Sequence, residues 1–191
     1  TLAGTLPQDR ELSGPTLGLS LVQPRYIKET FVDAMERVED FNLGNELSLT
    51  GGSFLRAWGS DADRWSWRAL DQQGLSLGEG RFALAQAGWQ GRLRAGRPEN
   101  AVLFGNLNFF WKLRGRVPQT WVAHLEANAA RGLDGENQLL LGGDTGLRGY
   151  RSKSFTGTRT FLLNLEDRLF WNREWFHLFY AGAAVFLDAG M

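Results

Sequence analysis

"AVLFGNLNFFWKLRG", residues 101–115, alternates between two kinds of side chain at nearly every position. One set is mostly apolar: Leu103, Gly105, Leu107, Phe109, Trp111 and Leu113. The other is largely polar: Phe104, Asn106, Asn108, Phe110, Lys112 and Arg114. Successive side chains of a β-strand point to opposite sides, so a period of two indicates a strand with two different faces.

The same alternation extends along the chain in both directions. Residues 121–129 set Trp121, Ala123, Leu125, Ala127 and Ala129 against Val122, His124, Glu126 and Asn128. Residues 41–52 set Leu43, Leu47 and Leu49 against Asn42, Glu46, Ser48 and Thr50. Turn-rich pieces such as "TGGS" and "RAGRPEN" separate further candidate strands at 16–23, 25–37, 63–73, 79–94, 158–171 and 175–189. The pattern predicts an all-β antiparallel meander of about eight or nine strands in one domain, 1–191, with residues 31–40 alternatively forming a short helical turn.

Composition excludes several classes of protein. Lys plus Arg equals Asp plus Glu, at 21 each, so no basic field for nucleic acid is expected. The absence of cysteine excludes disulfides and thiolate metal sites, and two isolated histidines do not indicate a metal centre. No apolar run approaches the ~20 residues of a transmembrane helix. The eight tryptophans and thirteen phenylalanines suit a membrane interface, although aromatic residues also fill soluble β-cores.

The polar faces of the strands carry amides and full charges at mid-strand positions, namely Asn106, Asn108, Glu126, Asn128, Asn164, Glu166 and Arg168. A soluble β-sandwich would turn such a face toward bulk water, whereas a membrane β-barrel would turn it toward a wet lumen. Several candidate strands are also longer than is usual in soluble sheets. Alternation by itself does not separate the two architectures.

"LGGDTGLRGY", residues 141–150, interrupts the alternation with three glycines and a pair of opposite charges. Glycine permits backbone shapes that other residues rarely adopt. The segment is therefore either a surface turn or a loop that folds back into a polar interior.

This segment resembles the signature of the BamA/TamA superfamily of outer-membrane barrels, the bacterial surface antigen family. The family's tetrapeptide V/I/L-R-G-F/Y is matched by Leu147, Arg148, Gly149 and Tyr150, and its preceding G-G-D is matched by Gly142, Gly143 and Asp144. "FLDAG", which begins at Phe186 and ends at Gly190, is similar to the family's F-x-D-x-G strand motif. "NLEDRLFW" is similar to the strand between these motifs, with Glu166 as its inward acid, and residues 39–49 read like an earlier strand.

The resemblance implies a lumenal loop at 142–157 that folds inside part of a transmembrane β-barrel. Arg148 would then meet Glu166 and Asp188 on the inner wall, because a guanidinium is suited to bidentate pairing with carboxylates. Asp167 would point outward, near a membrane interface. The alternative is that Arg148 caps a solvated turn and Asp188 ends an ordinary strand.

The function that the resemblance implies is insertion of outer-membrane proteins, or translocation of polypeptides, in the bacterial outer membrane. The expected partners are outer-membrane lipid and unfolded outer-membrane or secreted polypeptides, with no cofactor and no metal. No catalytic motif is present, so we expect no enzymatic activity. Two alternatives are a barrel that anchors a larger lipase-like protein and a soluble β-sandwich.

The family's chains continue past F-x-D-x-G, whereas this sequence ends at Met191. We therefore expect a partial barrel domain with an exposed strand edge. That edge would pair with a second copy, or with strands outside this sequence. Closure into a small barrel is disfavoured because the loop at 142–157 would crowd it.

Overall fold

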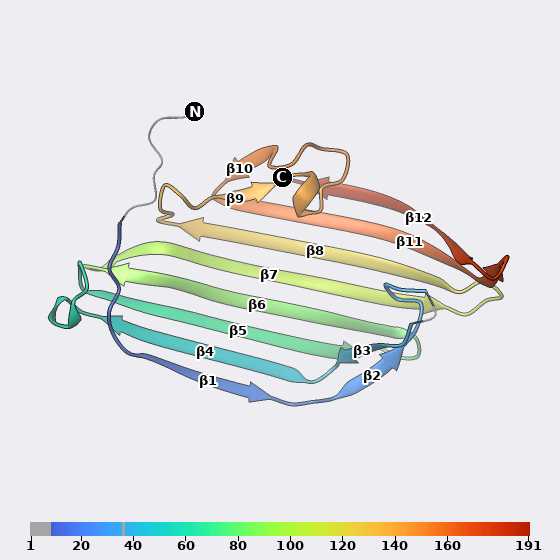
Figure 1. Ribbon diagram of the computed structural model, residues 1–191, viewed down its shortest axis with the longest axis horizontal. Coiled ribbons are helices and arrows are strands. Elements are labelled where there is room, and N and C mark those ends of the chain that lie inside the picture. Colours follow the sequence, from blue (N-terminus) through green and yellow to red (C-terminus); the bar gives the residue numbers. More distant parts are fainter. Residues whose placement is uncertain (1–8, 36) are drawn as a thin grey trace.

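One large antiparallel β-sheet dominates the computed structural model, which describes residues 9–35 and 37–191 (Figure 1). Its eight strands lie side by side in chain order: β1 (Thr16–Val22), β4 (Asn45–Phe54), β5 (Arg64–Ser76), β6 (Arg81–Arg94), β7 (Arg97–Leu113), β8 (Gln119–Arg131), β11 (Arg159–Trp175) and β12 (Phe179–Gly190). Every neighbouring pair is antiparallel. The predicted all-β antiparallel meander is confirmed.

Two small pairs of strands lie in the connections between the large ones. β2 (Tyr26–Glu29) pairs with β3 (Glu39–Asn42) between β1 and β4, and β9 (Leu139–Leu141) pairs with β10 (Phe155–Gly157) between β8 and β11. Two short 3₁₀ turns, η1 (Arg56–Trp58) and η2 (Gly143–Thr145), complete the elements. None of the described residues form a helix long and apolar enough to cross a membrane.

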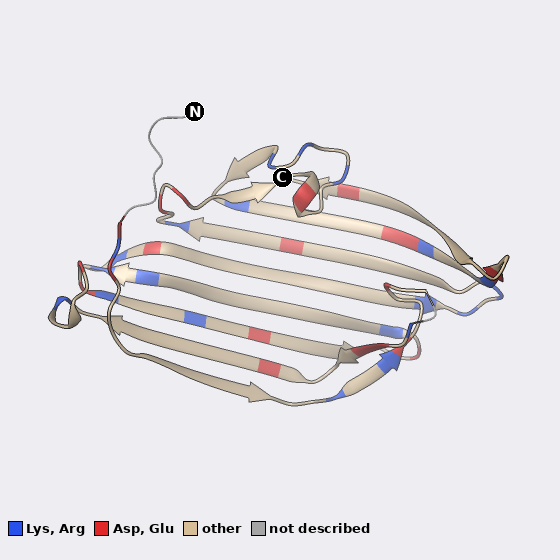
Figure 2. Ribbon diagram, in the orientation of Figure 1, with Lys and Arg blue, Asp and Glu red and all other residues tan. Residues whose placement is uncertain are grey.

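The two ends of the sheet differ in their connections. We call the end with the connections 55–63 and 132–158 the loop end, and the end with the short turns 77–80 and 114–118 the turn end. Residues 25–43, which include β2 and β3, lie at the turn end (Figure 1). Many charged residues lie at the two ends of the sheet and in the connections, and within the strands the consecutive charges Glu166, Asp167 and Arg168 stand out in β11 (Figure 2).

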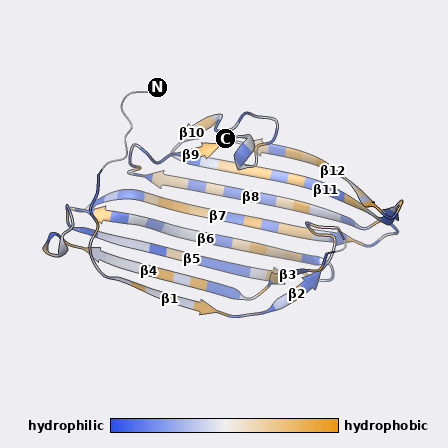
Figure 3. Cartoon of the chain, in the orientation of Figure 1, coloured by the Kyte–Doolittle hydropathy of each residue, from blue (hydrophilic) through white to orange (hydrophobic). Residues whose placement is uncertain are grey.

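The register sorts the side chains onto two faces, and hydropathy changes in bands along the strands (Figure 3). We call the face that carries Leu107 and Leu125 the outer face and the opposite one the inner face. On the outer face, Leu107 pairs with Leu125, and Leu165 pairs with Leu187. Val185 on this face is 73% exposed. The same face leaves further large apolar side chains exposed: Leu17, Leu19, Leu21, Trp65, Trp89, Leu103, Trp121, Trp171 and Phe179. Exposed apolar surfaces are typical of regions that contact a membrane or another protein.

The inner face carries the polar side chains and a small apolar core at the turn end. This core contains Val32, Leu43, Phe82, Phe110 and Val122, with Phe41 packed against it. The Phe41 and Phe82 rings lie 4.9 Å apart between centroids. Burial of these side chains holds residues 25–43 against the inner face.

The predicted strand at 25–37 is wrong in most of its length. β2 ends at Glu29, and residues 30–35 form bends, neither a strand nor the alternative helical turn. The chain reverses at Phe31, which has a φ of 59°. Thr120 Oγ1 donates a 2.7 Å hydrogen bond to the Phe31 carbonyl, and Val32 is fully buried. Packing on distant strands therefore decides the conformation here, not local alternation.

The predicted continuous alternation at 41–52 is also broken. Leu43 is buried in the inner core, whereas Leu49 belongs to the exposed outer face. Asn42 Oδ1 accepts hydrogen bonds from the backbone N–H groups of Gly44 and Arg25, each 2.9 Å long, and this side chain ends β3 before β4 begins. At the other end of the chain, Trp175 belongs to β11, and the predicted strand at 175–189 begins only at Phe179.

The sheet is open. β1 has β4 as its hydrogen-bonded neighbour, β12 has β11, and the two edge strands do not pair with each other. Edge strands present rows of unpaired N–H and C=O groups, which are templates for another strand.

We predict that Gly74→Ala destabilises the fold by about 1–3 kcal/mol. A Cβ at Gly74 would lie 2.2 Å from Leu43 Cα and 2.4 Å from the Asn42 carbonyl oxygen, so residues 42–44 could not cross the inner face as they do. The measurement is urea unfolding in detergent, with Gly51→Ala as the control. A Cβ at Gly51 meets nothing closer than 4.0 Å, so equal destabilisation of both variants would contradict this account.

Candidate functional site

The segment 142–157 forms a compact loop that begins after β9 and ends with β10. The Gly142 N–H donates a 2.7 Å hydrogen bond to Thr145 Oγ1, and the Gly143 N–H donates a 3.2 Å bond to the Arg151 carbonyl. Gly146 has a φ of 99°, and a Cβ there would lie 2.7 Å from Leu162 Cδ2 of β11. The left-handed backbone at Gly146 thus brings the loop directly onto the inner face.

Arg148 reaches from this loop to two carboxylates on neighbouring strands. Its Nε and Nη2 atoms donate to Asp188 of β12 at 2.8 and 2.6 Å, and Nη1 donates to Glu166 of β11. The Arg148 backbone N–H also donates to Asp188 at 3.0 Å. One arginine therefore fixes the loop to two adjacent strands through a bidentate fork and a further bond.

The surroundings of Arg148 complete the site. The Asp188 side chain is only 4% exposed, and Asn164 Nδ2 donates to it at 2.6 Å. The guanidinium carbon lies 3.8 Å from the centre of the Phe186 ring, which fits a cation–π contact. Hydrogen bonds to Asp188 raise the pKa of Arg148 above its usual value, so this cation is permanent.

The network continues along β11 to the opposite end of the sheet. Glu166 also accepts a 2.6 Å hydrogen bond from Arg168, and Arg168 pairs with Asp33 at 2.5 Å. Arg168 further donates to the Val32 carbonyl at 2.8 Å. The charged row Asp188–Arg148–Glu166–Arg168–Asp33 thus links the loop 142–157 to residues 25–43.

The remaining motif residues lie around this network in different roles. Leu147 is buried with Leu141 and Leu162, and Gly190 faces that cluster, because a Cβ there would lie 2.8 Å from Leu141 Cδ2. Gly149 and Tyr150 lie in the turn of the loop, where Tyr150 is 55% exposed and its ring packs at a tilt against Phe155.

Asp144 holds the loop from within. Its Oδ1 accepts a 3.1 Å hydrogen bond from the Lys153 backbone N–H. Hydrogen bonds from Ser152 and from this N–H lower the pKa of Asp144 below its usual range. The Asp144 carboxylate therefore stays ionised and holds the loop closed by its bond to the Lys153 backbone.

The hydrogen bonds of Arg148 hold the loop 142–157 against β11 and β12. Every oxygen of the two carboxylates already accepts at least one hydrogen bond from Arg148, Arg168 or Asn164. In the described part of the chain, no group of three or more His, Cys, Asp or Glu side chains is placed to hold a metal ion.

A second ion-pair cluster, at the loop end, was missed by the sequence reasoning. Arg64 is 1% exposed and pairs with Asp61 at 2.6 Å and with Glu99 at 3.1 Å. Its hydrogen bonds lower the pKa of Asp61 to about 2. Arg10 and Arg92 both pair with Asp134 at 2.8 Å. The sequence indicated this cluster only through the charged residues that accumulate at the strand ends. Such charges are ordinarily exposed to solvent.

We predict that Arg148→Ala costs about 1–3 kcal/mol and frees the loop, because it leaves Asp188 and Glu166 desolvated without a cation. The measurements are thermal unfolding and chymotrypsin cleavage at the exposed Tyr150 and Phe155. Arg151→Ala is the control, since it removes an exposed arginine from the same loop. Cleavage at the same rate in both variants would refute the role of Arg148 as the anchor.

Comparisons of the chain with protein-family models, with curated proteins and with solved structures found no match. Function is therefore argued from the residues and their geometry. The chain combines a loop that Arg148 holds on the polar face of the sheet with an opposite face that is exposed and apolar.

Proposed function

We propose that the eight-stranded sheet is part of the wall of a transmembrane β-barrel in the bacterial outer membrane. The support is the difference in polarity between the two faces of the sheet. Leu107 and Leu125 are paired and exposed on the outer face, whereas Asn106 and Glu126, one residue away on the same strands, are paired on the inner face. Alternation of apolar and polar side chains along every strand is what a lipid-facing wall around a wet lumen requires.

Tryptophans near both ends of the strands support the same proposal. Toward the turn end, the Trp111 and Trp121 rings lie 6.1 Å apart, and Trp171 lies near the end of β11. Toward the loop end, the Trp67 and Trp89 rings lie 5.0 Å apart. Tryptophan favours membrane–water interfaces, so the apolar band between these groups is the part proposed to contact lipid.

The position of Asp167 on the outer face fits this arrangement. Asp167 sits opposite Trp121 in the register, and both of its carboxylate oxygens accept 2.8 Å hydrogen bonds from Gln119 at the start of β8. A carboxylate beside an interfacial tryptophan avoids the cost of a charge at mid-bilayer.

We further propose that this wall serves insertion of outer-membrane proteins or translocation of polypeptides, without a cofactor. Two features support this function. The anchored loop carries the G-G-D and L-R-G-Y residues that resemble the assembly family, and the edge strands β1 and β12 present unpaired backbone groups. A free edge can pair with a strand of an unfolded client polypeptide, or with a second copy of the chain.

The membrane proposal is tested with single cysteines, since the chain contains none of its own. Leu125→Cys and Glu126→Cys, adjacent in β8, are each labelled with an environment-sensitive fluorophore in lipid vesicles. We expect brominated lipid to quench the label at 125 several-fold more than the label at 126, and aqueous iodide to show the reverse. Equal quenching at both positions would exclude a lipid-facing outer surface.

The insertion function is tested by following the folding of a urea-unfolded outer-membrane protein into vesicles that contain the chain. We expect several-fold faster folding than in empty vesicles. Ala183→Pro and Ala184→Pro provide matched variants, because successive N–H groups of β12 point alternately to β11 and to the free edge. The variant that loses a free-edge donor should keep its fold and lose the acceleration.

If the chain integrates into the bilayer but does not accelerate folding of the client, the insertion function is wrong. The alternative of a barrel that only anchors a larger protein would then account for the apolar outer face.

A further inference from the structure

Five polar side chains form a row across the middle of the inner face. Glu46 pairs with Gln72, Gln72 with Gln86, Gln86 with Asn106 and Asn106 with Glu126 in the registers of β4 to β8. Neighbouring strands lie about 4.8 Å apart, so the row extends over roughly 19 Å. None of these residues belongs to the loop 142–157 or to the charged row that anchors it.

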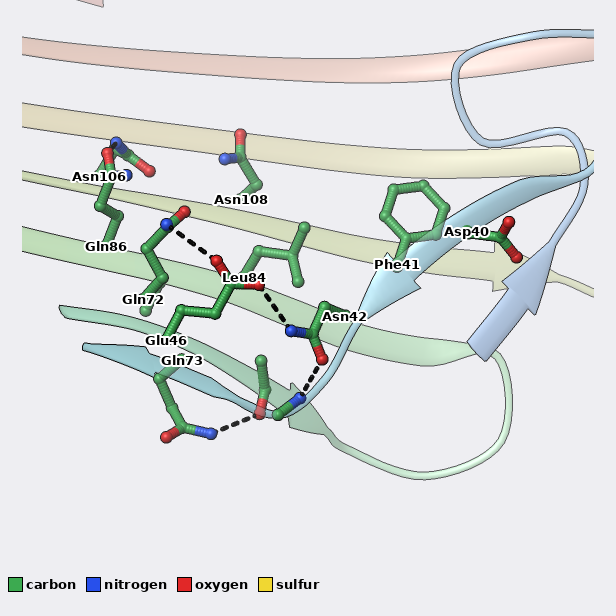
Figure 4. Close-up of a pocket in the computed structure, with 13 residues that line it drawn as sticks. Asp40, Phe41, Asn42, Glu46, Gln72, Gln73, Leu84, Gln86, Asn106 and Asn108 are labelled. Carbon is green, nitrogen blue, oxygen red and sulfur yellow. Dashed lines mark hydrogen bonds between the residues drawn. The ribbon is translucent and has the colours of Figure 1, made fainter. Parts of the chain in front are cut away.

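The first four residues of the row, from Glu46 to Asn106, form the floor of a cavity of about 280 Å³, which lies between β4–β7 and residues 40–44 (Figure 4). Phe41 and Asn42 of β3 bound one side, and Leu84 and Asn108 extend the floor (Figure 4). The volume lies just below the range for small-molecule sites, roughly 300–1,000 Å³, so the cavity suits a small ligand or part of a larger one. The cavity thus combines polar groups with a small apolar surface from Phe41 and Leu84.

The polar groups of the cavity include both donors and acceptors of hydrogen bonds. Asn42 Nδ2 donates to Glu46 at 2.7 Å, and Asn106 Nδ2 donates to Gln86 Oε1 at 2.8 Å. Gln86 accepts from Asn106, and its own amide N–H groups have no protein partner among the described residues. Each primary amide offers two donors and one acceptor, so unused hydrogen-bonding capacity points into the cavity.

The charges of the cavity lining also limit the ligands that it can bind. Among the described residues that line this cavity there is no lysine or arginine, although Asp40 and Glu46 contribute carboxylates. Elsewhere on the same face, the carboxylates at 99, 166 and 188 are each paired with arginine. This part of the inner face therefore disfavours phosphates and other anions.

We propose that the cavity binds a neutral saccharide. Sugar hydroxyls both donate and accept, so they match a row of three neighbouring amides flanked by two carboxylates. The apolar C–H face of a sugar ring can lie on Phe41 and Leu84. An extended polypeptide would need the row free along its length, but Asn42 closes the β4 end by its bond to Glu46. This site goes beyond the proposed insertion function and does not depend on it.

The test is isothermal titration calorimetry of the 191-residue chain with maltohexaose and cellohexaose as probes. The detergent is a zwitterionic amine oxide, because maltoside and glucoside headgroups would compete for the site. We expect saturable binding of at least one probe with a Kd on the order of 1 mM. Absence of saturable heat from both sugars at roughly ten times that concentration would overturn the proposal.

Two variants locate the site. Gln86→Leu should weaken binding about tenfold, the change that loss of one or two neutral hydrogen bonds produces. Gln90→Leu is the matched control on the same strand and face, outside this cavity, and should bind like the unmodified chain. Gln72→Leu, at an exposed position, tests the same row should Gln86→Leu fail to fold.

Equal affinity of the chains carrying Gln86→Leu and Gln90→Leu would place any sugar elsewhere and refute this site. Saturable binding of spermine or of hexagalacturonate, with none of the neutral sugars, would also refute it, because the assigned ligand carries no charge.

Discussion

The register between neighbouring strands is the constraint on which the rest of the structure depends. A slip of one residue exchanges the faces of a strand. In the observed register Leu107 lies opposite Leu125 and Asn106 opposite Glu126, so each face is continuous across β7 and β8. The same continuity brings Glu166 opposite Phe186 and Asn164 opposite Asp188 on β11 and β12. Without it, Arg148 would have no pair of carboxylates within reach.

The charged row on β11 and β12 then organises the parts of the chain that are not in the sheet. Arg148 holds the loop 142–157, and Arg168 holds residues 25–43, while Glu166 accepts from both. The Asp188 side chain is the buried charge of this row, at 4% exposed, and a buried charge is costly without a partner, so removal of Arg148 would affect it. Such a network contributes specificity of placement more than net stability: it determines where the two segments lie on the inner face. The apolar clusters around Val32 and Leu147 supply the burial that accompanies this placement.

The two faces of the sheet support different proposals. The outer face supports the proposal that the sheet is part of a membrane wall, because it has paired leucines and tryptophans near both ends of the strands. The inner face holds two separate polar regions: the arginine-centred row, in which charges neutralise each other, and the amide row from Glu46 to Glu126, which has spare hydrogen-bonding capacity. The carboxylates of the first row are bonded to arginines, whereas amide N–H groups of the second row remain unpaired and can bind a ligand. The free edges of β1 and β12 provide a third surface, whose recognition depends on backbone groups and not on side chains.

The sequence alone determined the long strands of the sheet, and its resemblance to a known family supplied the candidate partners of Arg148. Period-two alternation predicted the long strands because each strand must satisfy two different environments, and the phase of "FYAGAAVFLDAG" put Asp188 on the same face as Phe186. Tertiary structure alone decided the course of residues 25–43 and the crossing at Gly74, where the backbone of Leu43 occupies the space of a side chain. It also decided the burial of Arg64 among acids from two connections. These features depend on contacts between residues far apart in the chain, and such contacts leave no periodic trace in the sequence near either partner.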